Sequence, residues 1–260
     1  MKIINKAISV LDLFLNSGGE LSVEDISRLS GMNKSTARRI VLSLVECRFL
    51  QRQPRRGKYY LGLKLLDYIE TVKKNNPIVD AAEPFMYELL KTIDETISLA
   101  LWDGLKAVVC RSIYPNHPLR VMSAEGTMVA LHFASLGKAI LAEMPEEELD
   151  LRIGVGLSRY THNTITDIND LKKHLIIIRQ EGVAIDDEEA FLGVRGIAAA
   201  IKNNEGMVVG AVNVLGPSIR LTREKVREFM PAVKGCALNI SKALGYSEAP
   251  AKTPEKLPVA

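Results

Sequence analysis

Basic and hydroxyl side chains gather in one short stretch of the chain, from Lys34 to Lys58. The stretch holds eight Lys and Arg residues and one acid, Glu46. Arg can grip guanine with two parallel hydrogen bonds, and Ser and Thr hydroxyls can bond phosphates or bases. Positive charge at this density attracts a polyanion, so we predict contact with DNA, the alternative being a solvated basic helix face. The predicted DNA-contacting residues are Lys34, Ser35, Thr36, Arg38, Arg39, Arg55, Arg56 and Lys58.

A second group of residues could hold a small anion. Ser135, Leu136 and Gly137 open an apolar segment that is predicted to be a helix. The free backbone N–H groups of a first turn and the helix dipole favour a carboxylate there, and Gly137 permits close approach of a ligand. An ordinary helix start with tight packing is the alternative.

Four consecutive acids, Asp186 to Glu189, could bind a divalent cation or supply an acid and a base. Adjacent residues on a strand point to opposite faces, so these carboxylates converge poorly on one ion. We therefore interpret the cluster as a solvated strand end that leads into a helix.

Other catalytic chemistry has little support in the sequence. Gly154-Val155-Gly156 lacks the further glycine of a dinucleotide-binding loop. Cys47, Cys110 and Cys236 lie far apart, which predicts neither a disulfide framework nor a zinc site and suits a reducing cytoplasm. We expect no cofactor, no metal and no enzymatic activity.

The basic residues need elements that position them. Apolar residues recur at helical spacing over 4–16, 23–29 and 34–47. Ser22 and Asn33 are candidate N-caps, and Asp25 completes a variant of the capping box at Ser22. Two extended runs around Pro54–Gly57 predict a β-hairpin. This order is that of a winged helix-turn-helix, whose recognition helix enters the major groove while the hairpin tip reaches an adjacent backbone or minor groove.

The rest of the chain mixes strands and helices without strict β-α-β alternation, which favours an α+β fold. Helices are predicted over 78–92, 135–142, 146–152, 167–181 and 223–244, and strands over 97–102, 107–113, 119–123, 183–186, 197–201 and 208–215. The predicted division is a DNA-binding domain over 1–61, a linker helix over 62–76, a second domain over 77–246 and a disordered tail over 247–260.

The uneven distribution of charge indicates that the two parts of the chain have different functions. The overall charge of +3 divides into +7 over residues 1–75 and −4 over the remainder. No apolar run approaches the ~20 residues of a bilayer span, which argues against an integral membrane protein. The N-terminus lacks a secretion signal core, so we expect a cytoplasmic protein.

With these residues in hand, the chain resembles the IclR (isocitrate-lyase regulator) family of bacterial transcription factors over about residues 3–246. The N-terminal part of the resemblance comprises Lys6–Leu11, Leu29–Arg39 and the wing end Tyr59-Tyr60-Leu61-Gly62. The more specific C-terminal part comprises, in order, Leu131–Ala139, Gly182–Glu189, Gly193–Ala199 and Gly216-Pro217.

The resemblance implies a winged helix-turn-helix, a linker helix and a C-terminal GAF-like mixed α/β effector domain. It implies dimers or tetramers on palindromic operators in double-stranded DNA. Members commonly control catabolic operons and respond to small organic acids or aromatic compounds.

The resemblance also implies an effector pocket. In the family, the segment matching Ser135–Gly137 lines it, Asp186 matches a ligand-contacting acid, and positions matching Val194 and Gly196 contact the effector. The expected effector-binding residues are Ser135, Leu136, Gly137, Asp186, Val194, Gly196, Asn213 and Leu215.

The chemistry of this pocket departs from the family pattern. Gly196 stands where many members have Cys or Ser, and Asn213 and Leu215 stand where some acid-binding members have serines. Loss of hydroxyls and a thiol predicts a wider, less polar site, which disfavours a ligand as small as glyoxylate and leaves sugar acids or aromatic acids open.

The leading hypothesis is an allosteric regulator whose linker helix transmits effector binding to the DNA-binding domains. One alternative is a DNA-binding protein without a ligand, and a weaker one is an enzyme with residues 77–246 as its catalytic domain. A partly polar pocket near Ser135, Asp186 and Asn213 favours the sensor, whereas a filled core there favours the ligand-independent binder.

Overall fold

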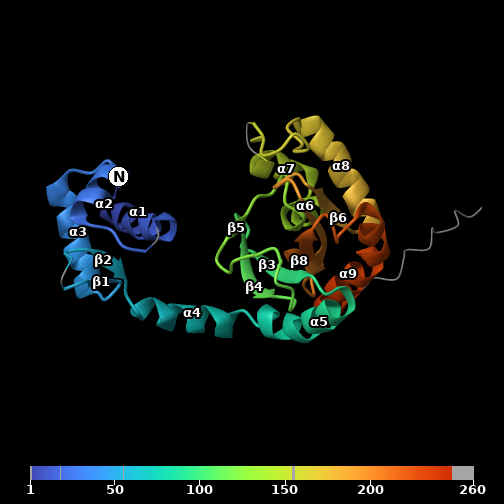
Figure 1. Cartoon of the computed structure of the whole chain (residues 1–260), viewed down its shortest axis with the longest axis horizontal. Helices are drawn as coiled ribbons and strands as arrows, with labels where there is room; N and C mark the ends of the chain where they lie inside the picture. Colours follow the sequence, from blue (N-terminus) through green and yellow to red (C-terminus); the bar gives the residue numbers. More distant parts are fainter. Residues whose placement is uncertain (1, 18, 55, 154–155, 248–260) are drawn as a thin grey trace, which may run out of the picture. The chain divides into compact units, whose positions relative to one another are not determined.

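The computed structural model describes residues 2–17, 19–54, 56–153 and 156–247 (Figure 1). The chain forms two compact units, Met1–Asn76 and Pro77–Ala260. Apart from Ser247, the tail predicted over 247–260 lies outside the described residues.

The first unit is a winged helix-turn-helix, as predicted. Its elements are α1 (Ile3–Asn16), α2 (Val23–Ser30), α3 (Lys34–Glu46), β1 (Leu50–Arg52), β2 (Tyr59–Leu61) and α4 (Lys64–Asn75). Strands β1 and β2 pair antiparallel, and Leu21 forms a bridge to Tyr59. The core joins α1, α2, α3 and both strands through residues that include Val10, Ile26, Ile40, Leu50 and Tyr59.

Local capping residues set the starts of α2 and α3. Ser22 Oγ accepts a hydrogen bond from the backbone N–H of Asp25 at 3.1 Å, and Asp25 Oδ2 accepts one from the backbone N–H of Ser22 at 3.1 Å. Asn33 Oδ1 accepts the Thr36 N–H at 2.9 Å. Both predicted caps are confirmed, and they satisfy first-turn donors that have no partner within the helix.

The second unit is built on a six-stranded sheet in the order β5-β4-β3-β8-β7-β6. Its strands are β3 (Thr96–Trp102), β4 (Ala107–Ile113), β5 (Met128–Val129), β6 (Ala184–Asp187), β7 (Val194–Lys202) and β8 (Val208–Pro217). Its helices are α5 (Ile78–Ile93), α6 (Ser135–Ala142), α7 (Glu146–Ile153), α8 (Ile168–Glu181) and α9 (Arg223–Ala243). Neighbouring strands run antiparallel.

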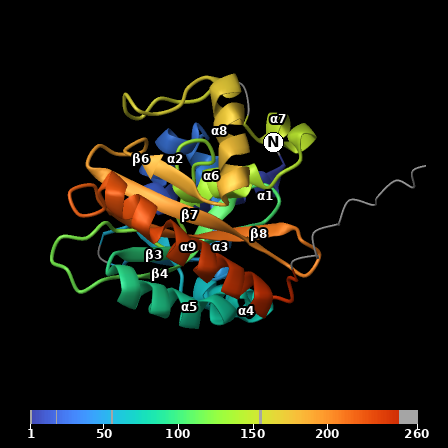
Figure 2. The same cartoon turned by 90° about the vertical axis from the view of Figure 1, so that its right-hand side faces the viewer.

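The two faces of this sheet bury different side chains, because successive strand residues point to opposite sides. Helices α5 and α9 lie side by side over one face (Figure 2), which presents large residues such as Ile97, Ile197 and Val212. Helix α6, with α8 packed against it, covers the other face, where Ala198 and Ala211 are small. Small residues let α6 lie close to the sheet.

One strand predicted from the sequence is wrong. Residues 119–123 form no strand, and their carbonyls accept side-chain bonds instead: Arg220 Nη2 donates to Leu119 O at 2.9 Å, and Thr96 Oγ1 donates to Val121 O at 2.7 Å. Strand β5, which is only two residues long, was not predicted from the sequence.

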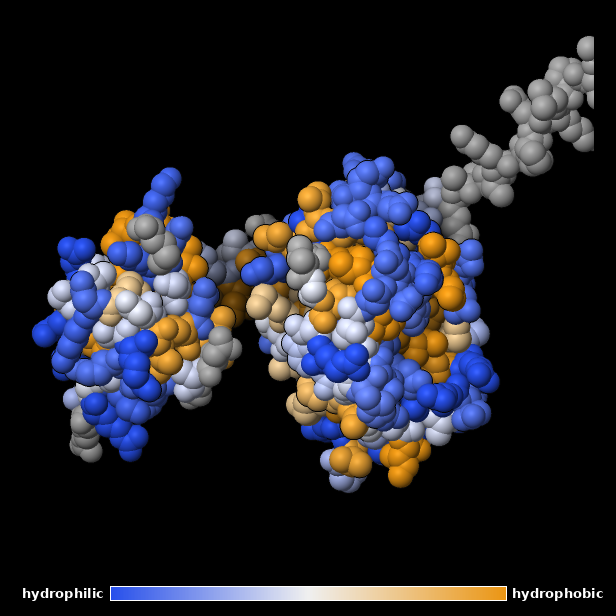
Figure 3. All heavy atoms as spheres, turned by 90° about the horizontal axis from the view of Figure 1, so that it is seen from above, coloured by the Kyte–Doolittle hydropathy of each residue, from blue (hydrophilic) through white to orange (hydrophobic). Residues whose placement is uncertain are grey.

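Hydrophobic and hydrophilic residues are interspersed on the surface of each unit (Figure 3). Among the residues that the structure describes, no helix combines the length and apolar character needed to cross a bilayer.

Candidate functional site

Helix α3 buries one face and exposes the predicted DNA-contacting face. Ala37, Ile40, Val41 and Leu44 are buried, whereas Lys34, Ser35, Arg38 and Arg39 are exposed and Thr36 is half-buried. Among the described residues, Arg38 and Arg39 enter no ion pair. Both guanidinium groups are therefore available to an anionic partner.

Two other residues at the start of α3 already have partners. Lys34 Nζ lies 2.5 Å from Glu24 Oε1 on α2, and both side chains are largely exposed. Ser35 Oγ donates to Asn33 Oδ1 at 3.0 Å. A phosphate that bound Lys34 would have to compete with Glu24.

The hairpin tip presents part of the predicted wing contact. Gln53 N donates to Lys58 O at 2.8 Å, which closes the hairpin. Gly57 has φ +62°, a left-handed conformation that suits glycine. Arg56 is exposed and Lys58 is half-buried, while Arg55 lies outside the described residues.

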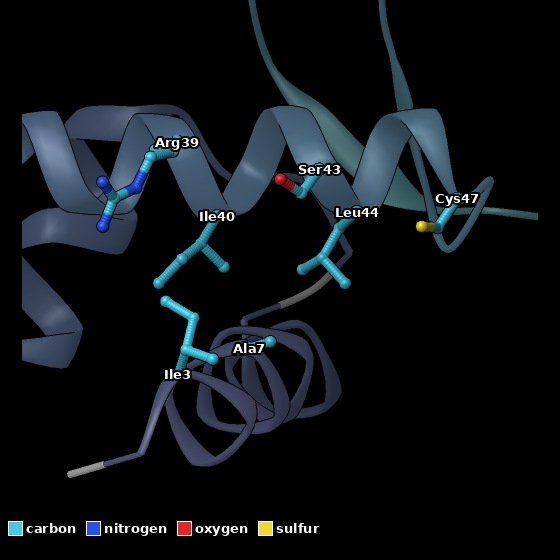
Figure 4. A pocket seen from close by; sticks show the side chains of 7 residues that line it. All are labelled: Ile3, Ala7, Arg39, Ile40, Ser43, Leu44 and Cys47. Carbon is cyan, nitrogen blue, oxygen red and sulfur yellow. The ribbon is translucent and has the colours of Figure 1, made fainter.

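A cavity of about 460 Å³ lies between α1 and α3 (Figure 4), lined by Ile3, Ala7, Arg39, Ile40, Ser43, Leu44 and Cys47. Figure 4 shows Ile3 of α1 pointing toward Ile40 of α3. The lining of this cavity is mostly apolar, and Arg39 is the lining residue that is also a predicted DNA contact.

In the second unit, strand pairing brings most of the predicted effector residues together. Asp186 pairs with Gly196, Gly196 pairs with Leu215, and Asn213 lies one row away on the same face of the sheet. This is the face that α6 covers. Ser135, the first residue of α6, lies above them, with its Oγ 3.5 Å from Asn213 Nδ2.

The absence of a side chain at Gly196 leaves room for the Ser135 side chain. A Cβ at position 196 would lie 2.7 Å from Ser135 Oγ and 3.3 Å from Leu215 Cδ1. The Ser135 hydroxyl therefore fills the space that a larger side chain at 196 would take. The wider, less polar site expected from the loss of Cys or Ser does not occur at this point, because α6 supplies a hydroxyl there.

Other predicted effector residues have packing roles in this structure. A Cβ on Gly137 would overlap the Ala130 carbonyl and lie 2.5 Å from Leu131 Cα, so the close approach at Gly137 is by the chain's own backbone. Leu136 is buried in the core cluster that α6 and α8 form with the sheet. Val194 is half-buried at the start of β7, and its N–H donates to Phe191 O at 3.2 Å.

A buried ion pair beside this site escaped the sequence analysis. The Lys138 side chain is 0% exposed, and its ammonium bonds the carboxylate of Glu189, which is 5% exposed. Glu189 N in turn donates to Asp186 Oδ1 at 2.8 Å. The available signal was that Lys138 is the only charged residue within the apolar helix 135–142.

The four acids do not converge on one ion, as predicted, but the prediction of a solvated cluster is wrong, because Asp186 and Glu189 are buried. Asp186 and Glu189 lie at the α6 side, whereas Arg195 Nε bonds Asp187 Oδ1 at 2.6 Å and Arg195 Nη2 bonds Glu188 Oε1 at 2.9 Å. The helix predicted after them is wrong, because Glu188 has φ +61° and the chain turns toward β7. The described residues include no cluster of His, Cys, Asp and Glu that could hold a metal ion.

Burial changes the acidity of the groups around Lys138. Desolvation raises the pKa of Asp186. Desolvation also raises the pKa of Glu189, although the Lys138 ammonium opposes the shift. Burial, and then the charge of Lys138, lower the pKa of His174. The protein thus favours the neutral forms of both acids more than water does.

Two acceptor atoms at this site have no hydrogen-bond partner among the described residues. They are Asn213 Oδ1 and Glu189 Oε2, and each residue is 4% exposed. Buried polar atoms without partners are uncommon in native proteins. A second cavity, of about 320 Å³, lies elsewhere in the unit, with Arg179, Lys202, Lys234 and Tyr246 in its lining. Neither this cavity nor the one between α1 and α3 is lined by Asn213 or Glu189.

Both units match models of known protein families. Residues 4–54 match the model of the IclR helix-turn-helix domain, and residues 70–242 match that of the bacterial transcriptional regulator IclR C-terminal domain. The chain is 32% identical to the HTH-type transcriptional repressor AllR of Escherichia coli strain K12 over 248 residues, which are 95% of this chain and 92% of that protein.

Solved structures share the whole fold. The crystal structure of Thermotoga maritima IclR aligns with a TM-score of 0.73 at 32% identity, over 94% of this chain and 98% of that chain. A proposed IclR transcriptional regulator from Silicibacter sp. TM1040 aligns with a TM-score of 0.83 at 27% identity, over 96% of this chain and 98% of that chain.

Proposed function

The chain belongs to the IclR family of bacterial transcriptional regulators, and we propose that it is a repressor of a catabolic operon whose operator binding is controlled by a small-molecule effector. In this proposal residues 1–61 bind a palindromic operator, residues 62–76 form the linker, and residues 77–246 bind the effector and form dimers or tetramers in the cytoplasm. Repression is supported by the name of the AllR relative.

The observation that supports operator binding most directly is the exposed basic face of α3. Arg38 and Arg39 project from the first turns of a helix whose opposite face is buried, which is the placement of base-contacting residues in this motif. If about six of the cations of α3 and the wing neutralise phosphates, the logarithm of affinity should fall against the logarithm of salt with a slope of ~−5.

Effector binding is proposed at the α6 face of the sheet, where Ser135, Asp186, Gly196, Asn213 and Leu215 meet. Buried polar atoms without partners favour a ligand site over a core that merely fills space. The ligand-independent DNA binder remains the alternative, and it predicts that no small molecule stabilises the second unit.

The test begins with selection of operators from a random DNA library by the full-length protein. We expect a two-fold symmetric sequence, since a symmetric dimer reads two half-sites. The variant Arg38→Ala/Arg39→Ala should then bind this DNA at least about 30-fold more weakly, because each base contact contributes about 1–3 kcal/mol.

A matched control removes the same charge from the second unit. Lys173 and Lys225 are exposed, and each pairs with an acid three residues away. Lys173→Ala/Lys225→Ala should bind the selected DNA with wild-type affinity. Binding of the arginine variant within twofold of wild type would refute the assignment of α3 as the recognition helix.

A further inference from the structure

We propose that the cavity of about 320 Å³ in the second unit is a further ligand site, which takes a small oxyanion with two negative charges. Its volume lies within the ~300–1,000 Å³ of small-molecule sites. Ser135 and Asn213 are not among its lining residues, so the cavity is separate from the effector site proposed above. The inference therefore does not depend on that site.

Three cations and one acid line this cavity. The cations are Arg179 on α8, Lys202 at the end of β7 and Lys234 on α9, and the acid is Glu143, which directly follows α6. Three positive charges against one negative charge leave the lining with an excess of two. An excess of one sign of charge in a concave site attracts the opposite ion.

Two of the cations are held in place by neutral groups. Arg179 Nε donates to Ala142 O at 2.6 Å, and its Nη2 donates to Met144 O at 2.8 Å. Lys234 Nζ donates to Glu181 O at 2.8 Å. Among the described residues, neither Arg179 nor Lys234 enters an ion pair. Their charges are therefore not neutralised, and Arg179 Nη1 and the other two ammonium protons of Lys234 are left for a ligand.

The third cation shows that a carboxylate fits in this cavity. Lys202 Nζ lies 2.7 Å from Glu143 Oε2, and the two side chains are 27% and 21% exposed. The ring of Tyr246 lies on the same ammonium, 5.9 Å from Nζ to the ring centroid. An oxyanion beside Lys202 would thus meet a cation that already binds a carboxylate, with Glu143 as its competitor.

The open edge of β7 adds a backbone donor. Ala198 pairs with Ala184, the first residue of β6, so no described strand covers β7 on this side beyond that pair. Every second residue of a strand directs its N–H to the same side, so Ala200 directs its N–H as Lys202 does, whose N–H donates to Ser241 Oγ at 3.0 Å. Ala200 lines the cavity, and within the described part of the chain its N–H has no backbone partner at this edge.

These donors define the class of ligand. Two cations that no acid neutralises, together with a backbone N–H, match an anion with two charges and several oxygen atoms, because hydrogen bonds between charged groups are about twice as strong as neutral ones. Inorganic phosphate, phosphate monoesters and dicarboxylates share this chemistry. Acetate carries half the charge and has fewer oxygen atoms.

Isothermal titration calorimetry of the full-length variant Arg38→Ala/Arg39→Ala tests the site, since this background removes the basic face of α3 as a competing anion site. The probes are inorganic phosphate, glycerol 3-phosphate, malonate and acetate at low ionic strength and about pH 8, where phosphate monoesters carry two charges. At least one dianion should bind once per chain with a dissociation constant of about 1 mM or lower, and acetate should bind at least about tenfold more weakly. The tightest probe then shows whether the source is a phosphate or a dicarboxylate.

Substitutions with opposite effects connect the binding to this cavity. Lys234→Gln should weaken the dianion at least about fivefold, which is the Coulomb attraction of two unit charges 4 Å apart in water. Glu143→Gln removes the competing carboxylate and should strengthen binding by a similar factor. The matched control is Lys242→Gln, because Lys242 is an exposed residue of α9 outside the lining, and it should leave the affinity unchanged.

Three results would overturn the inference. The first is the absence of saturable binding of every dianion up to about 10 mM, tenfold above the expected constant. The second is acetate binding as tight as that of the dianions, and the third is unchanged affinity in both Lys234→Gln and Glu143→Gln, which would assign the ion to another surface. Stabilisation of the second unit by a small molecule that persists in Lys234→Gln would still support the separate effector site, so the two proposals can fail independently.

Discussion

The buried pair of Lys138 and Glu189 makes a quantitative prediction about stability. Lys138→Met removes the ammonium and leaves the Glu189 carboxylate, which is 5% exposed, next to the buried Asp186. Removing one partner of a buried ion pair typically costs about 3–5 kcal/mol, because the remaining charge is uncompensated. For a unit of this size, that corresponds to a fall of about 6–20 °C in melting temperature.

The double variant Lys138→Met/Glu189→Leu should recover most of this loss. It removes both charges, and apolar replacements of buried ion pairs are often neutral or stabilising. Lys202→Met is the matched control, since Lys202 Nζ lies 2.7 Å from Glu143 Oε2 but both side chains are more than a fifth exposed. We expect it to cost about 1 kcal/mol or less.

Urea unfolding followed by tryptophan fluorescence is the suitable assay. The chain has one tryptophan, Trp102 on β3, so the signal reports the second unit alone. A free energy of unfolding of Lys138→Met within about 1 kcal/mol of the wild-type value in urea would refute the proposed role of the ion pair. It is also refuted if the double variant is as unstable as the single one.

Two further predictions concern the same unit. Gly137→Ala should lower the free energy of unfolding by about 1–3 kcal/mol, because its Cβ would overlap the Ala130–Leu131 backbone, whereas Gly235→Ala on α9 has no atom within 4 Å and should raise it by about 0.5–1 kcal/mol; equal effects in urea unfolding would contradict this. Asp186→Asn keeps the acceptor for the Glu189 N–H and removes a carboxyl whose pKa burial raises above 3.8. The folded state then binds the proton more tightly than the unfolded state, so the wild type loses stability as the pH rises above 3.8. The variant should therefore be the more stable protein at pH 7.5 and match the wild type near pH 3, and lower stability of the variant at pH 7.5 would exclude this account.

Local signals explain what the sequence could predict of the fold. The caps at Ser22 and Asn33 lie within three residues of the groups that they bond, so their chemistry is visible in the sequence. The prediction of a strand over 119–123 is wrong because carbonyl groups of this segment accept hydrogen bonds from the side chains of Thr96 and Arg220. Only the tertiary structure brings these two residues near. Hydrophobic alternation has no means of anticipating such side-chain partners.

The candidate site divides in the same way. Strand alternation placed Asn213 and Leu215 on one face correctly. Lys138 and Glu189 are 51 residues apart, and although each lies in a segment that resembles the family, nothing in either segment indicates that the two side chains pair. The two glycines show why a residue type alone does not identify its role. The absence of a side chain leaves room for the Ala130 backbone at Gly137 and for the Ser135 hydroxyl at Gly196. In the sequence, a glycine at a helix start equally suits close approach of a ligand.

The proposed effector contacts are large enough to regulate DNA binding. A 100-fold change in operator affinity requires about 2.7 kcal/mol of coupling between effector and DNA. Satisfying a buried acceptor such as Asn213 Oδ1 contributes about 1–3 kcal/mol, which is of this size, provided that the ligand reaches it in one arrangement of the protein and not in the other. Ser135 lies above Gly196 and beside Asn213, so a ligand that reaches the amide would contact the first residue of α6. Because Ser135 begins the helix that holds Lys138, α6 is the element through which effector binding should first act on the rest of the protein.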